Sequence, residues 1–297
     1  MTPKLMECVP NISEGRDMSV VRAVADAVRG VTGVVLMDCS SDADHNRSVV
    51  SFMGEPPAVE RAAVLLAGRA AELIDLTKHT GVHPRMGAAD VIPFIPIRGM
   101  EMSECAEASR RAARRIFSLH AVPVYLYAHS ASAPRRVNLA DIRRGGFEGM
   151  AEKVRLPGWE PDFGVAPHPT AGVTAVGARA PLIAFNVNLG TPDLSAAKAI
   201  AKAIRESSGG LPRVKALGLM LESRAAAQVS VNLTDWRVTP PRAVFDAVAA
   251  QAARLGVKAV SSEIVGLAPA GALPDGDAIH IRLEGFDFKR QILESYM

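Results

Sequence analysis

The segment at residues 78–87, KHTGVHPRMG, contains two histidines, His79 and His83, among glycines and a proline. Two histidines at this spacing on a helix can share a metal ion. However, Gly81 weakens a helix between them, and Pro84 directs His83 towards extended geometry. Because the segment also offers no convincing third ligand, we expect no metal site here.

Proton transfer is the chemistry that better suits His83. An imidazole titrates near neutral pH, so that one side chain can both accept and release a proton. Loops between a helix and a strand commonly carry such side chains at the surface. The alternative is a histidine that only packs or hydrogen-bonds to the backbone. Local sequence leaves both interpretations open.

Two further polar clusters follow expected strands. Residues 42–48, DADHNRS, are typical of a turn, but their arginine, Arg47, could also hold a carboxylate through two hydrogen bonds. Residues 9–16, VPNISEGR, either cap the next helix or place Asn11 and Glu14 beside a site at the strand end. Each cluster therefore has a structural and a functional interpretation.

The elements that must position these residues follow one order twice. Hydrophobic periodicity predicts strand, helix, strand, strand, helix and strand over residues 4–97, then a helix at 103–120 and a strand at 122–127. The first order recurs over residues 182–265. It is the order of the split βαβ unit of ferredoxin-like folds. The pattern thus predicts a protein of two parts that mixes helices and strands.

Two stretches are expected to depart from regular structure. Pro93 and Pro96 would confine the strand at residues 91–97 to a sheet edge or a bulge, because proline cannot donate to a ladder. Residues 134–177 are rich in Gly, Pro and Arg and predict a structureless linker or functional loop.

Composition and motif searches exclude several classes of protein. The 297 residues are 48% hydrophobic, and 34 basic against 31 acidic residues give a net charge of +3, too even for a nucleic-acid protein. No GxGxxG, GxxxxGK[ST], GxSxG or HExxH motif occurs, which argues against Rossmann, P-loop, serine-hydrolase and zinc-protease chemistry. Three cysteines without CxxC spacing, no secretion signal and no long apolar run predict a reduced, cytoplasmic protein without membrane spans.

Three longer segments together resemble a known family. They are residues 7–15 (ECVPNISEG), residues 83–96 (HPRMGAADVIPFIP) and residues 182–189 (LIAFNVNL). Shorter matches occur at residues 44–49, 122–127, 159–164 and 263–267. The combination is similar to the glutamate formimidoyltransferases, which also form the formiminotransferase domain of formiminotransferase-cyclodeaminase. The resemblance covers nearly the whole chain.

The resemblance implies an α+β fold of two ferredoxin-like (βαββαβ) subdomains, residues 1–177 and 178–297, with a substrate cleft between them. It also implies transfer of the formimino group from N-formimino-L-glutamate to tetrahydrofolate, which gives L-glutamate and 5-formiminotetrahydrofolate. Tetrahydrofolate would be the acceptor co-substrate, and no metal would be needed. We further expect a homodimer that binds neither nucleic acid nor membrane, and a separate cyclodeaminase that takes the product.

The family's site residues can be transferred to this sequence. The catalytic histidine falls on His83 and not on His79. The folate-binding loop falls on Gly164, Val165, Ala166, Pro167, His168, Pro169, Thr170, Ala171 and Gly172. Further candidates for substrate contacts are Asn11, Glu14, Asp38, Asn46, Arg47, Arg85 and Arg179. His83 should face the cleft, with the loop along one wall and Asn46 or Arg47 on the same side.

The chemistry of this transfer suits those residue types. The folate nitrogen attacks the amidine carbon, loses a proton, and the departing glutamate nitrogen gains one. A single imidazole with a near-neutral pKa could do both, contributing about 10²–10⁴ in rate. A carboxylate, Asp38 or Glu14, could stabilise the amidinium, and Arg47, Arg85 and Arg179 could hold substrate carboxylates.

Two alternative functions remain at the level of sequence. The protein could bind folate without turnover, although the intact run at residues 83–87 argues against this. It could also be a related folate-dependent transferase with a formyl group, or with another amino acid, in the donor.

Overall fold

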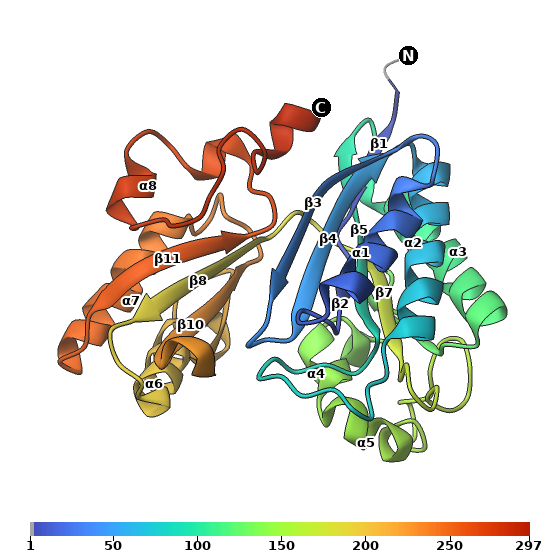
Figure 1. Cartoon of the computed structure of the whole chain (residues 1–297), viewed down its shortest axis with the longest axis horizontal. Helices are drawn as coiled ribbons and strands as arrows, with labels where there is room; N and C mark the ends of the chain where they lie inside the picture. The colour runs from blue at the N-terminus through green and yellow to red at the C-terminus, as the bar shows by residue number, and fades with distance from the viewer. Residues whose placement is uncertain (1–2) are drawn as a thin grey trace. The chain divides into compact units, whose positions relative to one another are not determined.

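The computed structural model describes residues 3–297 and divides into two structural units after Ala180 (Figure 1). The first unit contains a seven-stranded sheet. Both β1 and β2 pair with β4 on one side and β5 on the other, so they are successive segments at one position in the sheet. Beyond them, β3 pairs with β4, and β7 and then β6 follow β5 in parallel. The strands are β1 (Leu5–Cys8), β2 (Asn11–Ile12), β3 (Val34–Asp42), β4 (Arg47–Gly54), β5 (Ala89–Arg98), β6 (Val124–Ala128) and β7 (Thr174–Ala178).

Three helices cover one face of this sheet: α1 (Met18–Arg29), α2 (Pro56–Leu73) and α3 (Met102–His120) (Figure 1). The apolar side chains of α1 recur at helical spacing, and Asp17 caps its first turn by accepting from the Ser19 N–H at 2.8 Å. Alternate residues of the strands, such as Phe52 and Phe94, pack against the helices in one fully buried core.

The opposite face is partly covered by α4 (Leu139–Arg143) and α5 (Gly146–Lys153), which pack on Tyr125 and Tyr127 of β6. The expectation of a structureless segment at residues 134–177 was therefore wrong. The segment also contains a short 3₁₀ helix, η1 (Pro134–Arg136), and most of β7. Its helices are too short for hydrophobic periodicity to reveal them, and α5 begins at a glycine.

The proline-containing strand β5 lies inside the sheet, so the expected edge position was wrong. Pro93 lies opposite the break between β1 and β2, where its carbonyl accepts from the Val9 N–H at 3.3 Å. Pro96 lies at a register shift in the pairing with β1, as the alternative of a bulge predicted. The interruptions in the neighbouring position let two residues without an N–H occupy an interior strand.

The second unit is a four-stranded antiparallel sheet with the order β11-β8-β10-β9. One face packs against α6 and α7 in a separate core, and its elements follow the expected sequence of strand, helix, strand, strand, helix, strand. These are β8 (Ile183–Leu189), α6 (Leu194–Ile204), β9 (Val214–Leu221), β10 (Ala226–Leu233), α7 (Pro241–Arg254) and β11 (Ala259–Val265). The remaining short elements are α8 (Asp277–His280), η2 (Glu206–Ser208), η3 (Glu222–Arg224), η4 (Ala270–Ala272) and η5 (Leu293–Tyr296).

The whole protein is a mixed α+β structure, as expected. Among residues 3–297, no helix combines the length and the apolar character that crossing a membrane requires.

Candidate active site

The carboxylate of Asp90, at the start of β5, joins two arginines from different elements. Its Oδ2 accepts from Nη1 of Arg47 on β4 at 2.8 Å and from Nη2 of Arg143 on α4 at 2.7 Å. Its Oδ1 accepts from the Met86 N–H at 2.8 Å. Burial alone would raise the pKa of Asp90, but the two guanidinium groups and these hydrogen bonds hold it below its usual value. Asp90 is therefore an anion.

Two guanidinium groups share this one carboxylate, so the cluster carries an excess positive charge. The Arg47 and Arg143 side chains are only 10% and 13% exposed. Arg47 also donates from Nε to the Asn11 Oδ1 at 3.0 Å, whereas Nε of Arg143 is buried without a hydrogen-bond partner in the described part of the chain. An unsatisfied buried donor with excess positive charge is suited to binding an anion such as a carboxylate.

His83 lies in the electrostatic field of this cluster. Its side chain is partly exposed, and Nδ1 is 2.8 Å from the Pro84 carbonyl oxygen. Because a carbonyl only accepts, Nδ1 carries the hydrogen and Nε2 keeps the lone pair that can take a proton. Burial, then Arg47 and Arg143, hold the pKa of His83 well below its usual value rather than near neutrality. At neutral pH the side chain is therefore a neutral base.

The neighbour of His83 is a second histidine that the sequence interpretation did not single out. The rings of His45 and His83 have centroids 6.0 Å apart. His45 is buried, and its Nδ1 lies 2.9 Å from Oδ1 of Asp42, which also accepts the His45 N–H at 2.7 Å. These contacts fix the ring beside His83.

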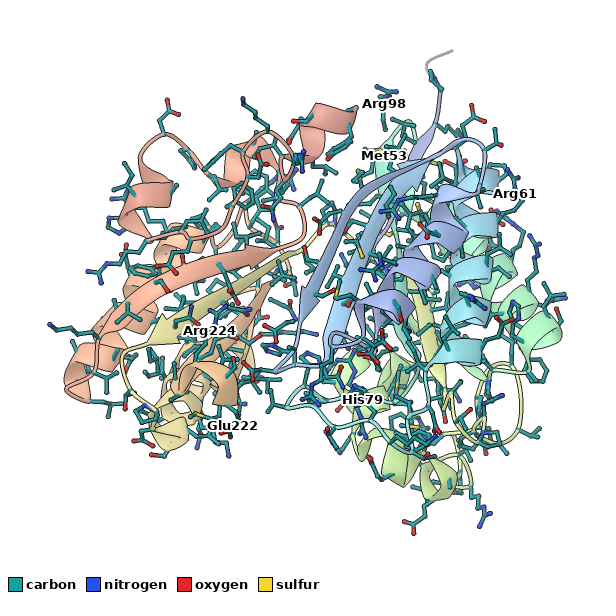
Figure 2. The ribbon with its side chains drawn as sticks, viewed as in Figure 1. Met53, Arg61, His79, Arg98, Glu222 and Arg224 are labelled. Carbon is teal, nitrogen blue, oxygen red and sulfur yellow. The ribbon has the colours of Figure 1, made fainter. Side chains whose placement is uncertain are left out.

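Figure 2 labels His79. Both of its ring nitrogens make hydrogen bonds. Its Nε2 donates to the Asn46 carbonyl oxygen at 2.9 Å, and its Nδ1 accepts from Nε of Arg85 at 3.1 Å. Arg85 itself forms a bidentate pair with Glu148 of α5, at 2.9 and 2.6 Å. The two side chains thus connect the loop at residues 78–85 to its surroundings.

Asn46 and Glu14 make their contacts with loop backbone. Asn46, at φ 47°, accepts from the Gly15 N–H at Oδ1 and donates to the Thr80 carbonyl oxygen, both at 2.9 Å. A Cβ at Gly15 would lie 2.3 Å from the Asp42 carbonyl oxygen, so only glycine allows this approach. Oε1 of Glu14 accepts from the backbone N–H groups of the next three residues, 15–17.

Asp38 and Arg179 make their contacts elsewhere on the first sheet. Asp38 of β3 pairs in register with Ser51, and its Oδ2 accepts from the Ser40 hydroxyl at 2.5 Å. Burial raises the pKa of Asp38. Arg179, directly after β7, donates to the Ala180 carbonyl oxygen at 3.0 Å and interacts electrostatically with Glu7.

The loop at residues 164–172 closes on itself and joins the segment that follows His83. His168 and Gly172 exchange backbone hydrogen bonds at 2.9 and 3.0 Å, and the Ala88 N–H donates to the Ala171 carbonyl oxygen at 2.9 Å. At its other end, Gly164 lies against the C-terminal part of α3. One end of the loop thus pairs with the segment that follows His83 in the chain, and the other contacts helix α3.

Asp90 and Arg143 are the members of the cluster that sequence reasoning missed as site residues. Asp90 lies within the run HPRMGAADVIPFIP, which carried the resemblance, and this position was the available signal. Arg143 gave none, because its segment was expected to be structureless. Among the described residues, no group of three or more His, Cys, Asp or Glu side chains is arranged to hold a metal ion.

Glu7 of β1 is a second buried carboxyl group on this sheet and gives a testable prediction. It is 5% exposed, and burial, opposed by Arg179, raises its pKa to about 7. The native state therefore holds a proton that the unfolded chain releases above pH 4.5, so stability should fall as pH rises from 4.5 towards 7. Glu7→Gln should be more stable than the wild type at pH 8, by up to about 3 kcal/mol, and equal to it near pH 4.

Urea unfolding of both proteins at pH 4 and pH 8 measures this difference. A Glu7→Gln variant that is less stable than the wild type at pH 8 would show that the charged form of Glu7 is the stabilising one.

Comparisons with known proteins identify related chains. The model of the formiminotransferase domain's N-terminal subdomain matches residues 5–179, and the model of the formiminotransferase domain matches residues 184–291. A glutamate formimidoyltransferase of Streptococcus pyogenes serotype M1 is 47% identical, across 99% of both chains. One of Thermoplasma acidophilum is 44% identical, across 99% of this chain and 97% of the relative. The formimidoyltransferase-cyclodeaminase of Mus musculus is 42% identical across 93% of this chain, which spans 52% of that relative.

Proposed function

Because the chain belongs to the formiminotransferase domain family, we propose that it transfers the formimino group from N-formimino-L-glutamate to tetrahydrofolate. The products are L-glutamate and 5-formiminotetrahydrofolate, and tetrahydrofolate is the acceptor co-substrate. The observation that carries this proposal is the near-complete match, at 47% identity, to a chain named glutamate formimidoyltransferase. Such a chain is a one-carbon group transferase.

The proposed architecture is two ferredoxin-like subdomains, expected at residues 1–177 and 178–297. The described structure divides slightly later, after Ala180, so that β7 stays whole in the first unit. The order β11-β8-β10-β9 supports it, because these are the fourth, first, third and second strands of their unit. The first unit has the same arrangement in β5, β1 with β2, β4 and β3. Each sheet carries polar residues on the face opposite its helices, which suits these faces to binding a polar substrate.

His83 is the proposed proton carrier. As a neutral base it takes the proton from the folate nitrogen once that nitrogen has bonded to the amidine carbon of the donor. The imidazolium then gives this proton to the glutamate nitrogen, and the carbon–nitrogen bond to glutamate breaks. The low pKa of His83 supports the second step, because a more acidic imidazolium protonates a leaving nitrogen more readily.

Arg47 and Arg143 are proposed to hold a substrate carboxylate beside His83. Their shared counter-ion, Asp90, satisfies one positive charge, and the unpaired Nε of Arg143 can donate to a bound carboxylate. Both substrates carry carboxylates. Asn11 is proposed to contact substrate at the same place, since its Oδ1 accepts a hydrogen bond from Nε of Arg47.

The remaining candidate residues keep their proposed roles with differing support. The 164–172 loop is proposed for folate, supported by the backbone bond that joins it to the segment after His83. Glu14, Asn46 and Arg85 are proposed at the site through the loops that they hold. Asp38 and Arg179 are also proposed to contact substrate. Their own contacts, with Ser40, Ala180 and Glu7, do not connect them to His83.

The biological setting follows from the same proposal. We propose a cytoplasmic protein whose partners are the two small substrates, without nucleic acid or membrane. We also propose that a separate cyclodeaminase takes the product. A homodimer stays a prediction.

A transfer assay tests the proposed function. The protein is incubated with formiminoglutamate and tetrahydrofolate, and acid converts the product to methenyltetrahydrofolate, which is measured by absorbance. Product should form in the presence of EDTA, because no metal is expected. Absence of product with tetrahydrofolate binding intact would identify a binding protein instead. Product from a formyl donor or another formimino amino acid alone would identify the related transferase.

A further inference from the structure

The second sheet presents polar side chains on the face opposite its helices. In β8, Phe185, Val187 and Leu189 are buried in the core with α6 and α7, so the alternation of the strand places Asn186 and Asn188 on the other face. This alternation was visible in the sequence, within a segment that carried the resemblance, but neither asparagine was assigned a role.

The strand register places two further polar residues beside these asparagines. Gln228 of β10 lies opposite Asn188, and Glu263 of β11 lies opposite Asn186. We call Asn186, Asn188, Gln228 and Glu263 the polar cluster. Three adjacent strands therefore contribute to one group of amide and carboxyl side chains.

Hydrogen bonds fix the orientation of these side chains. Oε1 of Glu263 accepts from Asn186 Nδ2 at 3.0 Å and from Gln228 Nε2 at 3.1 Å. Gln228 Nε2 also donates to Asn188 Oδ1 at 2.9 Å. Because Nε2 faces two acceptors, the Gln228 amide has only one consistent orientation. Asn188 is held in turn by donating to the Ser261 hydroxyl at 3.1 Å.

Two oxygens of the polar cluster are left able to accept. Oε1 of Gln228, whose residue is fully buried, is without a hydrogen-bond partner among residues 3–297. Oε2 of Glu263 is 3.9 Å from Nη1 of Arg224, an exposed side chain in the turn between β9 and β10 (Figure 2). An unpaired buried amide oxygen is costly, and such groups are usually satisfied by a ligand or water when they are retained.

We propose that Gln228 Oε1 and Glu263 Oε2 bind adjacent N–H groups of a planar N–C–N unit in a substrate. This inference rests on the proposed function, which offers two such units. One is the amidine of formiminoglutamate, and the other is the 2-amino-4-oxopyrimidine edge of tetrahydrofolate. A carboxylate oxygen beside an amide oxygen offers acceptors to both, and the negative charge of Glu263 favours an amidinium. Asn186 and Asn188 hold the two acceptors in place.

Glu263→Gln tests the proposal, because it removes the charge and keeps the size of the side chain. The affinity for one substrate should fall about tenfold or more, as expected when a hydrogen bond to a charged group is lost. If the amidine binds here, KM for formiminoglutamate rises and KM for tetrahydrofolate is unchanged. If the pterin binds here, the opposite holds, and calorimetry shows weaker binding of tetrahydrofolate alone. The matched control is Glu222→Gln, an exposed carboxyl group in the neighbouring turn (Figure 2).

Calorimetric titration of each substrate separates this proposal from the proposed function, because binding is measured without turnover. A wild type that binds both substrates without transfer overturns the function and still allows the binding comparison. Glu263→Gln binding both substrates within twofold of Glu222→Gln overturns the proposal, as does a wild type that binds neither. If Glu263→Gln unfolds, Glu263→Asp keeps the charge but withdraws Oε2, and the same loss of affinity is expected.

Discussion

Replacing His83 by asparagine should lower kcat by at least about 10²-fold while the affinity for tetrahydrofolate changes little. Asparagine keeps a polar side chain but cannot carry a proton between the two nitrogens. The transfer assay gives kcat, and calorimetry with tetrahydrofolate gives the affinity. His79→Asn is the matched variant, and its loss should be much smaller because His79 makes backbone and Arg85 contacts. Equal losses in kcat would contradict the assignment.

The pH dependence of the wild type provides a second check on His83. Because burial, Arg47 and Arg143 hold the pKa of His83 well below 6.5, the free enzyme already contains the neutral base at pH 6.5. The value of kcat/KM should therefore show no acidic limb with a midpoint near 6.5. Such a limb, if it disappeared in His83→Asn, would mean that the arginines do not act on this imidazole.

Asp90→Asn should lower the free energy of unfolding by about 3–5 kcal/mol, because it leaves two buried guanidinium groups without their counter-ion. Urea unfolding at pH 7 measures the change. Asp26→Asn is the control, since it breaks an exposed pair with Arg29 that should contribute less than about 1 kcal/mol. A loss for Asp90→Asn no larger than that of the control would show that the guanidinium groups reach solvent or another partner.

The order of helices and strands could be predicted where each element is long enough to show its period. The alternation of Phe185, Val187 and Leu189 and the spacing of Val21, Val24 and Val28 are examples, and both lie in the elements expected. The interior position of β5 could not be predicted, because it depends on where another segment breaks. The helices α4 and α5 were missed because their 5 and 8 residues span too few turns.

Some residues of the candidate site could likewise be predicted from the sequence, and others could not. The resemblance identified His83, which begins the run HPRMG, rather than His79 as the catalytic histidine. The pairing of Asp90 with Arg143, separated by 53 residues, could not be predicted, since nothing local to either residue indicates the other. The low pKa of His83 also depends on this pairing, because Arg143 is one of the cations that act on it. Charge excess at the site is a property of tertiary structure rather than of any one segment.

The hydrogen bonds of Asn46 connect three loops, so that the conformation of each depends on the other two. Residues 9–17, 42–47 and 78–85 exchange hydrogen bonds through Asn46, and Arg16 adds a bond to the Thr80 hydroxyl and another to the Ala43 carbonyl oxygen. If only one of these loops were replaced by the loop of a relative, hydrogen-bond donors and acceptors in the other two loops would lose their partners. Engineering of donor preference in this protein should therefore exchange all three loops together, as one cassette around a fixed sheet.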